Sequence, residues 1–462
     1  MSTLSRRSFL KQSGLLAAAV AAAGVSGTRI AGASDSGGTF EVGIAVRDIT
    51  PPTGAPLWGY SDALRVGTGT FSPLHARAVV FQVGGQRAGV VTLDLGRMPR
   101  PDVCARIRTE AKASGIGEVM ICASHTHSAP VMESSAMPYV KQMEAAIVDA
   151  LREAVANAQP ARIGVGRTDI DIAHNRRVIK DGKCYMMWRN AERKPTSPVD
   201  REAGVIRIDT ADGKPLAVLV NYACHPVIFG PDNIEYSADW PGEMCRLVKA
   251  ETGAECFFLQ GACGDINPYM DKMTLDEGAR DIVKAEGEKA GRAVLAAWGG
   301  IGSSVPAQPA VSSVLKPVGV GVRWDLDDPK QVEILKQVYG PAYDLYMAHI
   351  DKNLAVPLGV VVLNNTLALA FMPGELFVQF QLDLKKNSPL PDTFLCGYAN
   401  EFHAYFPTIR DAAIGGYGGA AATYVGLGAG EKLTAQASIQ IAKAIGKFGP
   451  VSGPEDFKVL EL

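Results

Sequence analysis

The chain has little of what marks several large classes of protein. Its 462 residues carry 46 lysines and arginines against 48 aspartates and glutamates, a formal net charge of -2. This balance gives no electrostatic reason to expect a nucleic acid as a partner. No CxxC pair occurs among the eight cysteines, which argues against a disulfide scaffold and against a thiolate zinc site. We expect buried thiols, with one or two disulfides open as an alternative after export.

The chain also lacks an apolar run of the roughly 20 residues that a membrane-spanning helix needs. Its alanine-rich run at 15–25 is shorter and follows Ser5-Arg6-Arg7-Ser8-Phe9-Leu10-Lys11, a twin-arginine export motif. The small residues Ala31-Gly32-Ala33 suit cleavage, and no cysteine stands there to carry a lipid anchor. We therefore expect a signal peptide at 1–33, a linker at 34–38, export by the Tat translocase, and a periplasmic or secreted protein without a transmembrane anchor. The alternative is an accidental Arg-Arg pair before an alanine-rich helix.

What remains has the composition of a globular protein, with 47% hydrophobic and 20% charged residues. Strand-like apolar runs alternate with helix-like segments, which predicts an α/β fold of mixed β-sheets flanked by helices. We expect one large domain over 39–462. The expected strands are 78–83, 89–93, 119–122, 217–222, 256–259 and 366–372. The expected helices are 140–156, 241–252 and about 275–298, with a further helix-like stretch opening at Glu375.

Residues of the types that bind metals follow three of the expected strands. Ser124-His125, His225 and Pro373-Gly374-Glu375 each come just after a strand end. In α/β sheets the ligand-binding loops gather at the carboxyl ends of the strands. The sequence therefore predicts that these three segments share one site.

The pair His125 and His127 alternates in Ser124-His125-Thr126-His127-Ser128. If the backbone stays extended, the two imidazoles point to opposite faces. One could then bind a metal, and the other could act on the substrate after the loop bends. Zinc accepts imidazole nitrogens and carboxylate oxygens, but hydrogen-bonded loop histidines would give the same motif.

The other metal-binding candidates each have an alternative. Pro226 restricts His225 to extended geometry, yet a lone buried histidine is more often a satisfied core residue. Glu375 could equally be a first-turn acid stabilised by the helix dipole. Arg176, after a short strand-like stretch, could hold a substrate oxygen or a surface carboxylate. The glycine-rich turn 260–268 could approach a ligand or be an ordinary turn.

Taken in order, these segments resemble the neutral/alkaline ceramidase family over roughly residues 40 to 425. The resemblance rests on many segments in one order, which is more specific than any single motif. The segments are 43–52, Gly59-Tyr60, Ala76-Arg77-Ala78, Asp94, His125-Thr126-His127-Ser128, Asn175-Arg176, 221–226, Gly264-Asp265, Pro268, Pro373-Gly374-Glu375 and 397–405.

The resemblance implies an α/β catalytic domain with one zinc ion held by two histidines, a glutamate and a tyrosine. Carried over by motif, these ligands are His125, His225, Glu375 and Tyr405. The surroundings of Tyr405 match the family's pattern only loosely.

The resemblance also implies the residues that act on the substrate. His127 and Arg176 would contact the scissile carbonyl or the developing oxyanion, and Asp94 would be a supporting acid near the histidines. Asp265 would orient the loop or a ligand. Asn267 stands where the family has a serine; it cannot act as a hydroxyl nucleophile but can hydrogen bond beside an activated water.

These expectations combine into an exported zinc-dependent amidohydrolase that cleaves an N-acyl linkage, in ceramide or a related compound, by zinc-activated water. Ceramide itself is open, because the chain is expected to lack the family's C-terminal β-sandwich domain. The alternatives are a zinc hydrolase of another ester, lactone or non-lipid amide, and a non-catalytic exported binding protein of the same fold. An apolar acyl groove would be lined by Trp58, Trp188, Phe377 and Phe402, although aromatic residues more often belong to the core.

Overall fold

The computed structural model describes residues 38–60, 65–132, 134–340, 343 and 350–449. They all belong to one compact unit, 32–462. The expected signal peptide at 1–33 lies outside the described residues, as does the expected linker except for Gly38. None of the described helices is both long enough and apolar enough to cross a membrane.

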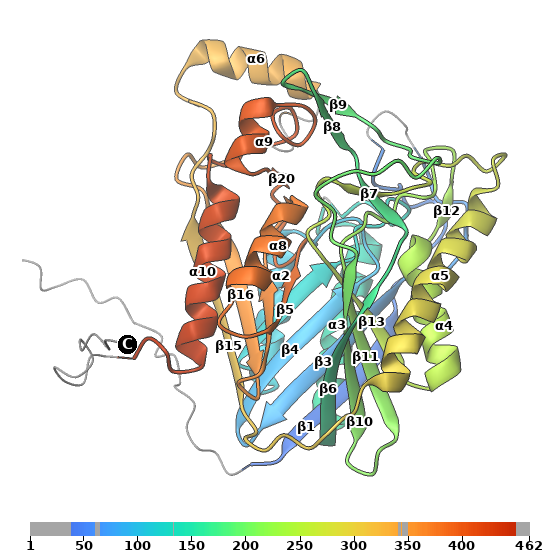
Figure 1. Cartoon of the computed structure of the whole chain (residues 1–462), viewed down its shortest axis with the longest axis vertical. Coiled ribbons are helices and arrows are strands. Elements are labelled where there is room, and N and C mark those ends of the chain that lie inside the picture. Colours follow the sequence, from blue (N-terminus) through green and yellow to red (C-terminus); the bar gives the residue numbers. More distant parts are fainter. Residues whose placement is uncertain (1–37, 61–64, 133, 341–342, 344–349, 450–462) are drawn as a thin grey trace, which may run out of the picture. The chain divides into compact units, whose positions relative to one another are not determined.

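Among the described residues, the larger sheet has the strand order β13-β11-β10-β6-β1-β3-β4-β5 (Figure 1). Its pairs β4–β5 and β11–β13 are parallel and the remaining pairs are antiparallel, so the sheet is mixed. The strands are β1 (Phe40–Asp48), β3 (His75–Val83), β4 (Gln86–Leu93), β5 (Glu118–Ala123), β6 (Gln159–Asp169), β10 (Glu202–Thr210), β11 (Pro215–Tyr222) and β13 (Glu255–Gln260).

A smaller sheet packs face to face against the larger one. Its strand order is β15 (Val311–Gly319), β16 (Ala355–Leu363), β17 (Leu367–Phe371) and β19 (Asp392–Cys396). Side chains from both sheets form one buried apolar cluster, in which Phe81 and Phe257 of the larger sheet join Phe371 and Phe394 of the smaller one. Burying each such side chain contributes about 1.5–3 kcal/mol.

Helices cover the outer faces of the two sheets. The larger sheet carries α2 (Pro101–Ala113), α3 (Pro138–Ala156), α4 (Asp239–Thr252) and α5 (Ala279–Gly300). The smaller sheet carries α8 (Val378–Asn387) and α10 (Ala429–Ala444), drawn in orange and red in Figure 1. Two further helices are α6 (Pro329–Tyr339) and α9 (Ile409–Ile414).

Short paired strands lie in the segments that connect these layers. The pairs are β2 (Gly69–Thr70) with β12 (Glu235–Tyr236), β7 (Ala173–Asn175) with β14 (Ile266–Pro268), β8 (Arg177–Lys180) with β9 (Lys183–Met186), and β18 (Glu375–Leu376) with β20 (Tyr405–Phe406). Two of these pairs, β7–β14 and β18–β20, hold residues predicted to lie in the site.

The expected fold class, mixed sheets flanked by helices, is confirmed. The expected hairpin is also present, because β3 and β4 meet at the turn Gly84-Gly85. The eight cysteines are all free, and only Cys184 is not fully buried.

Two predicted helix starts are wrong. Glu375 does not open a helix: its backbone N–H donates to Ala404 O at 2.8 Å, and it pairs with Tyr405 in a short parallel ladder, so α8 begins only at Val378. Helix α5 begins at Ala279 because Thr274 and Glu277 cap each other in a separate turn and Gly278 takes a left-handed conformation with φ 79°.

Candidate metal centre

Three imidazoles, two buried and that of His127 half-buried, converge beyond the carboxyl ends of strands of the larger sheet. His125 follows β5 and His225 follows β11, and their ring centroids are 4.9 Å apart. The Nε2 atoms of His125 and His127 are 3.4 Å apart. One ring nitrogen from each of the three histidines lies within 4.8 Å of the others, a grouping that could hold a metal ion. The structure thus brings together histidines from loops that follow separate strands.

A carboxylate from the short β18–β20 ladder completes the cluster. The Oε2 atom of Glu375 lies 3.2 Å from His225 Nε2 and 3.4 Å from His125 Nε2. Glu375 stands in β18, just after β17, and its side chain is buried. The cluster thus offers nitrogen and anionic oxygen ligands directed at one point, the donor set that zinc takes in proteins.

One glutamine holds the two histidine loops together. Although β5 and β13 are opposite edges in the strand order, Gln260 at the end of β13 donates from Nε2 to Ser124 O at 2.8 Å and to Cys224 O at 3.0 Å. Ser124 and Cys224 directly precede His125 and His225. The spacing of the two imidazoles is therefore set by a side chain that the sequence did not single out.

The backbone bends at the first histidine of the pair. His125 has φ 71°, a left-handed conformation that is costly for a residue other than glycine. The extended geometry expected for residues 124–128 ends there, so both imidazoles face the same space instead of opposite faces. Gly59, with φ 117°, makes room: a Cβ atom on it would lie 2.6 Å from His127 Cβ.

Backbone carbonyls orient two of the imidazoles. His125 Nδ1 lies 2.5 Å from Gly96 O, and His225 Nδ1 lies 2.9 Å from Ile266 O. A carbonyl oxygen can only accept, so Nδ1 carries the proton and the lone pair of Nε2 faces the cluster. Metal-binding histidines are usually fixed in this way.

The electrostatics of the cluster suit a cation. Burial lowers the pKa of His127 well below its ordinary value and lowers that of His225 to about 3, so both rings are neutral at pH 7. Burial alone would raise the pKa of Glu375, but the imidazoles of His125 and His225 hold it well below the usual range. Neutral imidazoles beside an ionised carboxylate are the protonation states that metal binding requires.

Two tyrosines lie beside Glu375. Tyr405, the predicted fourth ligand, pairs with Glu375 through β20 and accepts a hydrogen bond from Arg176 Nη2 at 2.9 Å. Tyr398 donates to Glu375 Oε2 at 3.3 Å and stacks on the ring of His125 at 4.1 Å between centroids. Burial raises the pKa of both phenols well above the usual value. Nothing in the sequence beyond its place in the segment 397–405 marks Tyr398.

Arg176 and the glycine-rich turn form a second side of the site. Arg176 is buried; its Nη1 donates to Asn267 Oδ1 at 3.0 Å and its Nη2 to Gly264 O at 2.6 Å. Asp265 accepts from Val378 N at 2.8 Å and from Asn175 Nδ2 at 2.7 Å. Asp265 thus ties the turn to the segments that carry Arg176 and Glu375, a placement compatible with its predicted orienting role.

Asp94 lies apart from the imidazoles. It stands after β4 and forms a buried ion pair with Arg77 Nη1 at 2.8 Å, while Arg77 also contacts Glu255 at 3.2 Å. Within the described residues, none of the hydrogen bonds or ion pairs of Asp94 reaches the three histidines. Its predicted role as a supporting acid stays a prediction, and its contacts stabilise the larger sheet.

The aromatic residues divide into two groups. Trp58 and Phe402 pack on the histidines, with Trp58 at 5.2 Å from His125 and 5.0 Å from His127 between ring centroids. Trp188 lies on the other side, under the guanidinium of Arg176 at 5.1 Å. Phe377, which we expected in the same groove, is instead buried in the core of the smaller sheet. The sequence did not identify Tyr417, whose ring lies 5.4 Å from Tyr405 and 5.3 Å from Trp188.

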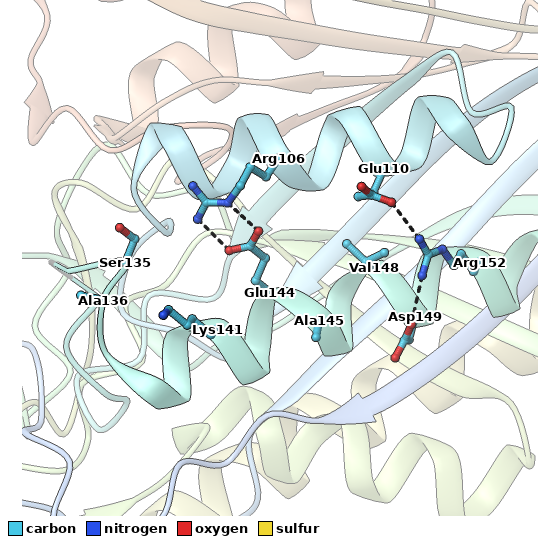
Figure 2. A pocket seen from close by; sticks show the side chains of 10 residues that line it. All are labelled: Arg106, Glu110, Ser135, Ala136, Lys141, Glu144, Ala145, Val148, Asp149 and Arg152. Atoms are coloured by element: carbon cyan, nitrogen blue, oxygen red, sulfur yellow. Dashed lines mark hydrogen bonds and ion pairs between the residues drawn. The ribbon is translucent and has the colours of Figure 1, made fainter.

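A hollow elsewhere on the surface, between α2 and α3, has different chemistry (Figure 2). Its charges pair with one another: Arg106 with Glu144 at 2.7 Å, and Arg152 with Glu110 at 2.8 Å. No histidine lines it. Because the hollow lacks the group of metal-binding side chains found at the imidazoles, we place the site at the imidazoles.

Comparisons with known proteins bear on the family and the fold of the chain. The curated "Neutral ceramidase B" of Dictyostelium discoideum is 26% identical over 282 residues, which cover 53% of this chain and 38% of that relative. The solved neutral ceramidase of Pseudomonas aeruginosa superposes with a TM-score of 0.67 at 18% identity, covering 88% of this chain and 74% of that one. A structure titled "Ceramidase complexed with C2" gives a TM-score of 0.66 at 17% identity, covering 90% and 77% of the two chains.

At these identities the two superpositions establish the fold. The chain matches only 38% of the length of the curated relative, so this match does not by itself establish an activity. The profile of the neutral/alkaline non-lysosomal ceramidase family, N-terminal part, matches residues 40–274, which contain all three histidines of the cluster. The chain belongs to the neutral/alkaline non-lysosomal ceramidase family.

Proposed function

We propose that the chain is a zinc-dependent amidohydrolase that cleaves an N-acyl linkage in ceramide or a related compound. The observation that carries the proposal is the cluster of buried imidazoles with Glu375 Oε2 at 3.2 and 3.4 Å from two of them. A bound cation would compensate the charge of this buried carboxylate, which lies beside His225, an imidazole that burial keeps neutral. Membership of the ceramidase family supports an amide as the bond that is cleaved.

His125, His225 and Glu375 would hold the ion, with Tyr405 or Tyr398 as a neighbouring phenol. Zinc, when bound, supplies a Lewis acid and lowers the pKa of water from 15.7 to about 7. His127 would then exchange a proton at Nε2, the atom that faces the cluster. It is suited to accept that proton because burial keeps it neutral.

Arg176 would stabilise the negative charge that develops on the carbonyl oxygen. Its guanidinium is buried, and its hydrogen-bond partners Asn267, Gly264 O and Tyr405 are all uncharged. The positive charge is therefore not neutralised by a directly bonded carboxylate and is fixed before the reaction begins. Asn267 carries no hydroxyl, so water is the proposed nucleophile.

Export is a separate part of the proposal. It rests on the twin-arginine motif at residues 5–11 and on the small residues at 31–33. A fusion of residues 1–38 to a reporter, compared with the same fusion carrying Arg6→Lys and Arg7→Lys, tests it. We expect the reporter outside the cytoplasm only with the arginine pair.

The catalytic part is tested by metal analysis coupled to substrate screening. The purified protein is analysed for metals and incubated with ceramide, an N-acyl amino acid, an N-acyl amino alcohol and a fatty acid ester. We expect one zinc per chain and release of fatty acid from an N-acyl substrate. Stoichiometric zinc without any release would contradict the proposed activity and favour a binding protein of the same fold, and release from the ester alone would favour another hydrolase.

A further inference from the structure

The imidazole of His127 is held differently from the other two imidazoles of the cluster. His125 and His225 each have Nδ1 beside a backbone carbonyl oxygen, at 2.5 and 2.9 Å. The Nδ1 atom of His127 is buried without a hydrogen-bond partner. Its Nε2 atom lies 3.4 Å from His125 Nε2, a contact inside the cluster. Within the described part of the chain, therefore, no hydrogen bond from outside the cluster fixes this ring.

Two aromatic rings hold the imidazole of His127 instead. Trp58 and Tyr60 lie against it, each with 5.0 Å between ring centroids. Gly59, between them, leaves the space that the imidazole fills, since a Cβ atom there would come 2.6 Å from His127 Cβ and Cγ. A side chain held by packing is placed only as accurately as its neighbours are. The position of His127 therefore depends on the position of residues 58–60.

Arg65 connects these aromatic residues to the histidine loop. It is only 4% exposed, and its Nη2 donates to Trp58 O and to His127 O, the latter at 2.7 Å. Its Nη1 donates to Asn233 O at 3.1 Å, and its guanidinium carbon lies 4.7 Å from the ring centroid of Tyr60. One side chain thus contacts both the aromatic segment and the peptide of the histidine that this segment encloses.

Stability alone does not account for a cation in this place. Among the described residues, the side-chain hydrogen bonds of Arg65 all end on uncharged peptide oxygens, and its Nε is buried without a partner. A buried charge without a counter-ion is unfavourable, and apolar side chains in its place are often as stable. Arg77, by contrast, is buried in ion pairs with Asp94 and Glu255. What the planar guanidinium of Arg65 provides is a rigid fork of donors that fixes several acceptors at once.

We propose that Arg65 is a positioning residue for the proposed reaction, which holds the two aromatic rings around His127 and so aims its Nε2 atom at the cluster. The inference rests on the proposed function, in which His127 exchanges a proton with the reacting groups. Loss of Arg65 should therefore impair proton transfer more than it impairs binding of the substrate or of the metal.

Two octanoyl substrates with different leaving groups test the assignment. The amine of N-octanoyl-2-aminoethanol leaves only after it takes up a proton, whereas the p-nitrophenolate of p-nitrophenyl octanoate leaves without one. In Arg65→Met we expect kcat for the amide to fall by about 100-fold, because a misplaced acid–base group loses about that factor. The ester should lose less than about 10-fold, since its leaving group needs no proton. KM for the amide and the zinc content should not change.

Two further variants separate the fork geometry from the charge and from a general effect of losing an arginine. Arg65→Lys keeps the charge but not the planar fork, so kcat for the amide should fall by a smaller factor, about 10-fold. It also replaces Arg65→Met if that variant does not fold. The matched control is Arg162→Met on β6, which removes a guanidinium that likewise donates to a peptide oxygen, Ser303 O, at 2.9 and 3.2 Å. It should change neither rate.

Hydrogen exchange gives a measurement that does not depend on turnover. The backbone N–H groups of Trp58 and His127 donate to Ala129 O at 2.8 Å and to Pro226 O at 3.4 Å. Without the bonds from Arg65 this region should open more readily. We expect these two amides to exchange about 10–100-fold faster in Arg65→Met, the factor that corresponds to a lost hydrogen bond from a charged group. Mass spectrometry of the peptides that contain them measures the exchange.

Three results would overturn the inference: equal losses for the amide and the ester, a raised KM with unchanged kcat, or unchanged exchange at Trp58 and His127. If the unchanged protein cleaves the amide alone, kcat and KM for the amide decide. If it releases octanoate from neither substrate, or from the ester alone, the proposed function fails. The exchange rates then decide whether Arg65 holds His127 in place.

Discussion

The two sheets supply different halves of the candidate centre. Loops that follow β5 and β11 of the larger sheet carry the three imidazoles, whereas β18, beside the smaller sheet, carries Glu375. The imidazoles of His125 and His225 are held by backbone carbonyls, and Glu375 by a two-residue ladder with β20. The profile of the family covers the first half, residues 40–274, and stops before the second. The proposed ligands therefore meet only where the loops of the larger sheet lie against β18.

Removing an imidazole should have the largest effect on metal binding and activity. We expect His125→Ala to lose both metal and turnover, by more than the 10–100-fold that loss of an outer hydrogen-bond partner costs. Elemental analysis and an amidase assay measure the two losses. His75→Ala, which changes a half-buried histidine away from the cluster, should keep its zinc. Stoichiometric zinc in His125→Ala would show that the ligand assignment is wrong.

Breaking the larger sheet's buried ion pairs should destabilise the fold without a specific effect on the metal. Arg77→Met leaves Asp94 without its closest cation, which costs about 3–5 kcal/mol of unfolding free energy in urea. The exposed pair of Arg106 and Glu144 provides the control, since Arg106→Met should cost about 0–1 kcal/mol. If folded Arg77→Met binds zinc more weakly than the unchanged protein, Asp94 does support the histidines, as the sequence predicted.

Changing the carboxylate tests the smaller-sheet half. Glu375→Gln keeps the size of the side chain but removes its charge, so we expect zinc affinity to fall by about 100-fold while the fold is retained. A competition titration with a chelator measures the affinity. Glu401→Gln alters a carboxylate that pairs with His403 instead, and its zinc affinity should not change. Equal affinities in both variants would exclude Glu375 as a ligand.

The buried carboxyl group of Asp239, in the first turn of α4, should make the stability of the fold depend on pH. Burial raises the pKa of Asp239 to about 6, against about 3.9 in the unfolded chain, with Asp271 adding repulsion. The folded state holds this proton more tightly, so the associated stability is full below pH 4 and lost as the pH rises through 6. We expect the unfolding free energy of Asp239→Asn, relative to that of the unchanged protein, to rise by about 2–3 kcal/mol between pH 4 and pH 7. Urea unfolding at both pH values measures this, and a constant difference would contradict it.

The smallest effect on activity is expected at Tyr417, an exposed ring beside Arg176. Tyr417 is 43% exposed and its ring lies 5.6 Å from the guanidinium carbon of Arg176. Tyr417→Ala removes one cation–π contact, so kcat/KM should fall by about 2–5-fold with unchanged zinc content. Tyr185→Ala removes a more exposed ring on β9, at 54%, and should change neither. A larger loss would mean that Tyr417 contacts the substrate.

The sequence predicted the parts of the site that depend on local pattern. Strand exits before His125, His225 and Glu375 followed from apolar runs, and parallel pairing at β4–β5 and β11–β13 places such exits at one edge. The bend at His125 could not be predicted, because a left-handed residue there is imposed by packing and not by local preference. For the same reason the sequence predicts a helix start at Glu375, where the structure has a short strand. The strand's partner, Tyr405, is 30 residues away. Tyr398 and Gln260 were missed because their roles depend on contacts between distant segments.

The position of Gln260 has a mechanical consequence. One amide nitrogen spans the peptide oxygens ahead of both histidines, so the two loops cannot drift apart without losing both of its bonds. The spacing of the two imidazoles is thus governed by one side chain that is not itself part of the cluster. Glutamate in its place would put carboxylate oxygens beside the two peptide oxygens. Their mutual repulsion would push the two loops apart.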